Sequence, residues 1–205
     1  MSAMKSDTDI HTLSDQARAC TLCATHLPMG PRPVFQVSNR SKILIAGQAP
    51  GRKVHETGIP FDDPSGKRLR RWLGVDRDTF YNPDNFAILP MGFCFPGTGK
   101  SGDNPPRPEC APQWREDFLG AMPEQKLRLI IGQYAIGWHL PQVRKQTLTQ
   151  TIVDWRSFWP ELLVMPHPSP RNIGWFKANP WFEQDIIPEL QKQVKAIFAP
   201  PQDLE

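Results

Sequence analysis

A three-layer α/β/α sandwich with a central four-stranded parallel sheet is the fold class that the sequence predicts. Four short apolar runs are typical of strands buried on both faces, and helical segments alternate with them along the chain. Seven Trp and eleven Phe require a packed interior, so the 23 Pro indicate stiff loops rather than disorder. We expect residues 1–205 to form a single domain, because the length fits one core.

The first half of the chain predicts two helices and two strands. Residues 7–18 repeat apolar positions at helical spacing, and residues 42–47 (KILIAG) form a continuous apolar run. A long loop is expected up to Gly66, followed by a helix over residues 67–74 with basic side chains outward. Residues 86–90 form the second strand-like run. The expected inward-facing positions of the two helices are Ile10, Leu13, Ala17, Leu69, Trp72 and Leu73.

The second half continues the alternation. A helix is expected over residues 112–122, a third buried strand over 127–131 and a short helix near 135–140. The fourth strand covers residues 162–165. An amphipathic stretch at 181–198 predicts a final helix, and its internal proline is expected to kink it.

Rigid polar loops follow the first and last of these strands. GQAPG, at residues 47–51, lacks the Gly-Lys-Ser/Thr of a phosphate-binding P-loop and does not match GxGxxG. HPSPRN, at residues 167–172, contains two prolines together with histidine, serine and arginine. Ligands of parallel sheets bind beyond the carboxyl ends of the strands, so we expect a binding site at these loops.

Charge and hydropathy exclude some classes of partner. The chain has 24 basic and 21 acidic residues, and this balance alone does not indicate a nucleic-acid partner. No apolar run approaches the roughly 20 residues of a membrane span, and residues 1–18 lack the apolar core of a signal peptide. We therefore expect a soluble, cytoplasmic monomer with no membrane partner. The basic run Lys67, Arg68, Arg70 and Arg71 is either a ligand footprint or a solvated helix face.

Four cysteines are candidates for metal ligation. Cys20 and Cys23 form a CxxC pair, whereas fifteen residues separate Cys94 from Cys110. Disulfides are disfavoured in a reducing cytoplasm. A zinc site, an iron–sulfur cluster and unpaired buried thiols all remain open from the residues alone.

The two motif loops together resemble those of the uracil-DNA glycosylase superfamily. In that family a first motif ends the first strand and an HPSP-type motif ends the last, as residues 47–51 and 167–170 do here. The similarity extends from residue 19 to about residue 197. It is greatest to family 4, the iron–sulfur type, because gaps of 2, 70 and 15 residues separate the cysteines. HPSPRN itself is closer to the single-strand-selective monofunctional glycosylases.

The resemblance implies a 4Fe–4S cluster on Cys20, Cys23, Cys94 and Cys110, which would join the N-terminal segment to the 94–110 loop. It also implies a monofunctional DNA glycosylase that hydrolyses the N-glycosidic bond of uracil, or a related deaminated base, and so initiates base excision repair. The substrate would be DNA containing the deaminated base. No lysine stands in a motif where a Schiff base would form, so lyase activity is not expected.

Site roles follow from the resemblance by position. His167 would donate a hydrogen bond to the departing base, and Phe61 would be its stacking platform. Gln48 would act in catalysis and, with Ala49, contact the base, while Asn104 would position water or the sugar. The expected DNA contacts are Ser169 on a phosphate and a wedge of Pro170, Arg171 and Asn172.

The chain departs from the family at three motif positions, and the acidic residue that the family has a few positions after the first motif is also missing near residues 54–55. Gln48 stands where family 4 has glutamate, Ala49 where family 1 has aspartate, and Pro90 where several families have an asparagine that reads uracil. An amide cannot be a general base. The nearby substitutes that the sequence offers are His55, Glu56, Asp62 and Asp63.

Two alternative functions remain open from the sequence. The missing carboxylates are compatible with a non-catalytic or covalent uracil-DNA-binding iron–sulfur protein. A zinc-bound small-molecule hydrolase on an α/β sheet is the alternative from another class.

Overall fold

The structure is a computed structural model that describes residues 9–100 and 102–200. Its central sheet has four parallel strands in the order β2-β1-β5-β6, which confirms the predicted fold class. The strands are β1 (Ile43–Ala46), β2 (Phe86–Ile88), β5 (Leu127–Ile131) and β6 (Leu162–Met165). All four match the expected runs, because each is apolar enough to be covered on both faces.

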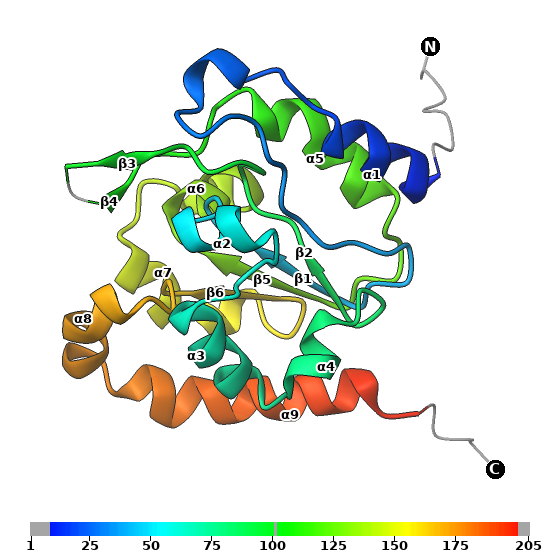
Figure 1. Ribbon diagram of the computed structural model, residues 1–205. Helices are drawn as coiled ribbons and strands as arrows, with labels where there is room; N and C mark the ends of the chain where they lie inside the picture. Colours follow the sequence, from blue (N-terminus) through cyan, green and yellow to red (C-terminus); the bar gives the residue numbers. More distant parts are fainter. Residues whose placement is uncertain (1–8, 101, 201–205) are drawn as a thin grey trace.

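One face of the sheet is covered by α1 (Ile10–Arg18) and α5 (Cys110–Gly120), which lie side by side (Figure 1). Side chains alternate along a strand, so Leu44 and Ala87 point to this face. They pack in one buried cluster with apolar side chains of both helices. The expected inward positions of the first helix are confirmed, as Ile10, Leu13 and Ala17 are buried.

The opposite face is covered by α3 (Pro64–Leu73) and α9 (Ile187–Phe198) (Figure 1). Ile43 and Ile45 point to this face and share a buried cluster with Trp72. The inward positions expected for residues 67–74 are buried, and the helix begins earlier because Asp63 caps it by accepting from the Gly66 N–H at 2.8 Å.

Several short helices lie outside the predicted pattern. The expected loop up to Gly66 instead contains α2 (Arg52–Thr57), which ends on a left-handed Gly58. A six-residue helix with two buried side chains gives too little apolar periodicity to be seen in a sequence. The other helices are α4 (Arg77–Tyr81), α6 (Gln133–His139), α7 (Leu148–Val153) and α8 (Ile173–Ala178), of which only α6 was expected.

The predicted C-terminal helix is interrupted near Pro188. Residues Phe182–Ile186 form a π-helical turn, and Pro188 is the second residue of α9, directly after that turn. Elsewhere, a two-stranded hairpin of β3 (Thr98–Gly99) and β4 (Gly102–Asp103) projects from the loop between Cys94 and Cys110 (Figure 1). Within the described ranges, no helix is long and apolar enough to cross a membrane.

Candidate active site

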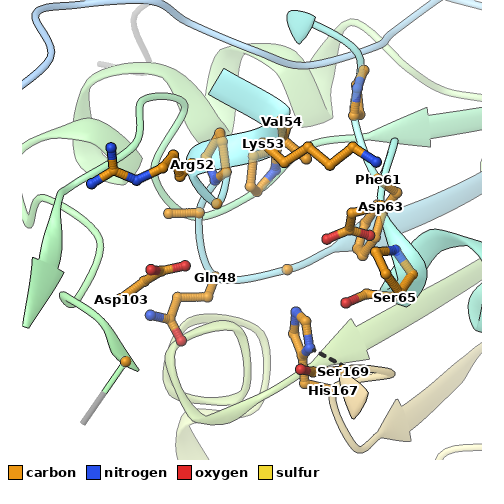
Figure 2. Close-up of a pocket in the computed structure, with 18 of the residues that line it drawn as sticks. Gln48, Arg52, Lys53, Val54, Phe61, Asp63, Ser65, Asp103, His167 and Ser169 are labelled. Atoms are coloured by element: carbon orange, nitrogen blue, oxygen red, sulfur yellow. Dashed lines mark hydrogen bonds between the residues drawn. The ribbon is translucent and has the colours of Figure 1, made fainter. Parts of the chain in front are cut away.

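A cleft of about 840 Å³ lies beyond the carboxyl ends of β1, β2 and β6 (Figure 2). This volume is typical of small-molecule pockets. The two motif loops form opposite parts of its wall, and α2, the start of α3 and the β3–β4 hairpin complete it. Its lining includes Gln48, Ala49, Pro90, Phe61, His167, Ser169, Pro170, Arg171 and Asn172 from the sequence-derived set, together with Arg52, Lys53, Asp63, Ser65 and Asp103.

His167 lies two residues after the end of β6 and is held as a neutral imidazole. Its Nδ1 accepts a hydrogen bond from the Ser169 backbone N–H at 3.2 Å, which leaves the ring proton on Nε2 (Figure 2). Burial lowers the pKa of His167 below its usual range, against the opposing influence of Asp63 and Asp103. Nε2–H is therefore a hydrogen-bond donor that carries no positive charge.

The loop that carries His167 is held in place by hydrogen bonds from its own side chains and from Arg68 of α3. Asn172 Nδ2 donates to the His167 carbonyl oxygen at 2.8 Å, and Ser169 Oγ accepts from the Arg171 N–H at 3.2 Å. Arg68 Nη1 reaches the carbonyl oxygens of Pro168 and Ser169 at 3.4 and 3.3 Å. These bonds hold the imidazole in one orientation.

Three of the four basic residues of the run on α3 contact other residues of the protein. The Arg68 guanidinium lies 4.7 Å from the Phe176 ring centre, and Arg70 Nη1 lies 3.4 Å from the Tyr81 hydroxyl. Arg71 pairs with Glu183 at 3.3 Å. Of the four basic residues, Lys67 alone is exposed and without a partner among the described residues, so the run is mainly a structural face of the helix.

Phe61 occupies a strained position on the cleft wall. Its φ is 54°, the only positive φ of a non-glycine residue in the described ranges. A Cβ on Gly66 would lie 1.8 Å from the Phe61 carbonyl oxygen, so only glycine permits this turn. The Phe61 and His167 ring centres are 6.4 Å apart at 31°. One half-buried aromatic face thus lies beside the histidine donor.

The first motif loop contacts the hairpin. Gln48 Nε2 donates to the Asn104 backbone oxygen at 3.2 Å. The Asn104 side chain donates instead to the Pro96 carbonyl oxygen at 3.2 Å, and Asn104 is not among the lining residues. Its side chain holds the loop together, whereas its neighbour Asp103 faces the cleft (Figure 2).

The sequence suggested four residues as substitutes for the missing carboxylate. Of these four, only Asp63 lines the cleft. Asp62 pairs with Arg77 at 3.1 Å. His55 is buried on α2 beside Phe95, and its Nδ1 has no partner in the described part of the chain. Sequence reasoning missed Asp103, because nothing in GDNPP reveals that this loop folds back to the cleft.

Pro90 is buried two residues after the end of β2, and its carbonyl oxygen accepts a hydrogen bond from the buried Arg115. Arg115 Nη1 donates to the Leu89 and Pro90 carbonyl oxygens at 3.0 and 3.1 Å, and Nη2 donates to that of Leu89 at 3.1 Å. The His139 Nε2 lies 2.9 Å from Arg115 Nη2. Burial lowers the pKa of Arg115 to about 10. Burial and the charge of Arg115 lower that of His139 to about 3.

The four cysteines are free thiols, and the described residues contain no group of three or more His, Cys, Asp or Glu that could hold a metal ion. Burial, together with the charges of Cys94, Cys23 and Cys20, raises the pKa of Cys110 to about 12. The pKa of Cys94 is raised to about 11 by burial and by Cys20 and Cys23. The mutual influence of the four thiols on these pKa values places them in one region, where they offer an all-sulfur set of donors.

A comparison with protein families identifies a match for most of the chain. The family model of the uracil DNA glycosylase superfamily matches residues 35–191, a segment that contains both motif loops and the hairpin. Among solved structures, the chain is similar to a solution NMR structure of a candidate uracil DNA glycosylase from Methanosarcina acetivorans. The two chains are 15% identical with a TM-score of 0.47, over 78% of this chain and 98% of that chain. At this level the structural likeness carries no inference about activity.

Proposed function

The chain belongs to the uracil DNA glycosylase superfamily, and we propose that it is a monofunctional DNA glycosylase that removes uracil, or a related deaminated base, from DNA. The observation that carries the proposal is the neutral His167, whose Nε2–H is free to donate in the cleft beside Phe61. Enzymes that act on a base extrude it from the duplex into such a pocket. Base excision repair begins with this step.

Cleavage of the C1′–N1 bond leaves its electron pair on the base and positive charge on the sugar. For uracil the negative charge spreads to O2, which a neutral donor at hydrogen-bond distance stabilises. A cationic histidine would be costly in this buried position, and the lowered pKa of His167 agrees with a neutral donor. His167 would therefore stabilise the leaving base without transferring a full proton.

The base would be held by the first motif loop and by Phe61. Stacking on an aromatic side chain contributes roughly 1–3 kcal/mol per base. Gln48 and Ala49 line the cleft, and the Gln48 amide offers both donor and acceptor groups to the base edge. Pro90 offers no side-chain donor, and its carbonyl oxygen is engaged by Arg115. For this reason the proposal includes deaminated bases other than uracil.

DNA would lie across the mouth of the cleft. Arg52, Lys53 and Arg171 are exposed residues of the cleft lining, where their charges would face phosphates. The Ser169 hydroxyl stands beside them as a further phosphate partner. Pro170, Arg171 and Asn172 form a helical turn after His167 and would enter the gap left by the flipped base.

The cysteines would hold a 4Fe–4S cluster that joins the N-terminal segment to the 94–110 loop. Cys110 is the first residue of α5, and Cys23 is buried near it. The cluster would supply a cross-link between segments that are far apart in the sequence. It is proposed as a structural group, and no chemical step depends on it. The single domain of residues 1–205 is part of the same proposal.

The test of this function is single-turnover excision from an oligonucleotide with one uracil, with alkali cleavage to reveal abasic sites. His167→Ala should lower the rate about 10²–10³-fold, the effect of removing one donor that stabilises developing negative charge. His11→Ala is the matched control, because His11 is exposed on α1. Near-normal turnover by His167→Ala would remove His167 from the mechanism.

Binding measurements separate the alternatives. A wild-type protein that binds uracil-DNA but releases no base from it would favour a non-catalytic DNA-binding protein. A protein–DNA adduct that survives denaturation would favour a covalent binder.

A further inference from the structure

Water must attack C1′ after the base departs, and the cleft needs a group to orient it. This inference rests on the proposed glycosylase function. Neither Gln48 nor Ala49 can accept a proton at neutral pH, although they occupy the motif positions where related proteins have carboxylates. Among the described residues, the carboxylates that line the cleft are Asp63 and Asp103.

Asp63 is already engaged in the fold. Its Oδ1 accepts from the Gly66 N–H at 2.8 Å and caps α3. This contact occupies one carboxylate oxygen and fixes the orientation of the side chain toward the helix N-terminus. Replacing it would also destabilise the helix that positions Arg68.

Asp103 is free to act on a ligand. It is exposed, and its carboxylate makes no hydrogen bond or ion pair with another residue that the structure describes. Its Oδ2 lies 3.3 Å from the position that a Cβ on Gly51 would take, so the carboxylate lies against the first motif loop. Figure 2 shows it facing the interior of the cleft beside Gln48.

The hairpin holds Asp103 in this place by bonds at both ends. Asp103 pairs with Thr98 across the two strands, and the Asn104 N–H donates to the Gly97 carbonyl oxygen at 2.8 Å. Gln48 Nε2, in the first motif loop, donates to the backbone oxygen of Asn104, the residue after Asp103. Gly102 has a φ of +135°, and a Cβ there would lie 3.3 Å from Arg171 Nη1. The hairpin therefore reaches both motif loops.

We propose that Asp103 is the catalytic carboxylate that orients the attacking water and accepts its proton. After the C1′–N1 bond has broken, the water oxygen forms the new bond to C1′, and its electron pair replaces the one that left with the base. One hydrogen stays on the new C1′ hydroxyl, and the other passes to the Asp103 carboxylate. That proton is then released to the solvent or to the departed base anion, so the carboxylate is regenerated.

The test compares Asp103→Asn with the wild-type protein in single-turnover excision of uracil. The amide keeps the size of the side chain but cannot accept the proton, so the rate should fall about 100-fold or more. Affinity for an oligonucleotide with a non-hydrolysable 2′-fluoro-2′-deoxyuridine should stay within about threefold of wild type, because the pocket is intact. Asp78→Asn is the control for charge, since Asp78 lies in the first turn of α4, outside the cleft lining.

The outcomes separate this inference from the proposed function. Excision by Asp103→Asn at the wild-type rate would overturn the role of Asp103 and leave the glycosylase function standing. A large loss of both rate and analogue affinity would also overturn it, since it would indicate that Asp103 holds the hairpin or the DNA. If the wild-type protein releases no base, the proposed function itself fails.

Discussion

The backbone of Phe61 lies in the left-handed region, and its carbonyl oxygen occupies the space that a Cβ on Gly66 would need. A bulky residue in this region costs on the order of 1–3 kcal/mol. The surrounding structure maintains the strain, and the ring is left half-exposed on the cleft wall. Phe61 also packs edge-on against Phe80, with ring centres 6.5 Å apart, so a core role has to be separated from a role in stacking.

Phe61→Ala is expected to lower uracil excision by roughly 10–100-fold, because stacking contributes roughly 1–3 kcal/mol per base. Affinity for undamaged duplex should change little, since the exposed basic residues are kept. Phe61→Tyr should retain most of the activity. Circular dichroism and thermal melting of each variant provide the control: if Phe61→Ala unfolds, Phe61 is a core residue and its stacking role is rejected.

Among the secondary-structure elements, α5 links the proposed cluster ligands to the residues that follow β2 at the cleft. It begins at Cys110, one of the four proposed cluster ligands, and its Arg115 reaches the carbonyl oxygens that end β2. His139 of α6 contacts the same guanidinium. A buried cation with no described carboxylate partner therefore links three elements under the cleft. This arrangement requires His139 to stay neutral.

Acid should destabilise the protein through His139. Its pKa in the folded state is about 3, below the usual value near 6.5 of an unfolded chain. Below pH 6.5 the unfolded state binds this proton and the folded state does not, so the free energy of unfolding falls as pH falls. Urea unfolding at pH 7 and pH 5 should show a loss about 1–2 kcal/mol greater in wild type than in His139→Gln. Equal losses in the two proteins would show that His139 is not buried as a neutral group.

The helices of this site were only partly predictable from sequence. The pattern at residues 112–122 predicted the helix, which begins two residues earlier at Cys110. Nothing in that pattern indicated that Arg115 is buried, because charged residues are rarely fully buried and its partners lie 24–26 residues away. Likewise Arg68 was expected on an outer basic face, whereas its guanidinium holds the second motif loop.

At the scale of the whole molecule, the sheet and both helix layers followed from four apolar runs and the helical segments between them. His167, Phe61 and Gln48 lie at one cleft because parallel strands end at the same edge. Asp103 could not be found in this way. Its position depends on a two-residue pairing and on a contact to a loop about fifty residues earlier, neither of which leaves a local pattern.

The cluster proposal makes a prediction for the whole chain. Protein purified without oxygen should be brown, with roughly four iron and four sulfide per molecule. Removing the iron with a chelator should lower the melting temperature, because the cluster would cross-link the half-buried Cys94 and Cys110 to the N-terminal segment. Cys94→Ser should reproduce this loss. A colourless protein with stoichiometric zinc would contradict the cluster and favour a zinc site.

The measurement that tests the central claim most directly is base release by the wild-type protein from a matched set of oligonucleotides. Each carries one uracil, hypoxanthine or xanthine, in single-stranded and double-stranded form, and mass spectrometry identifies the free base. We predict release of uracil or another of these deaminated bases, together with an alkali-labile abasic site. Retained binding with no release from any member of the set would contradict the glycosylase function.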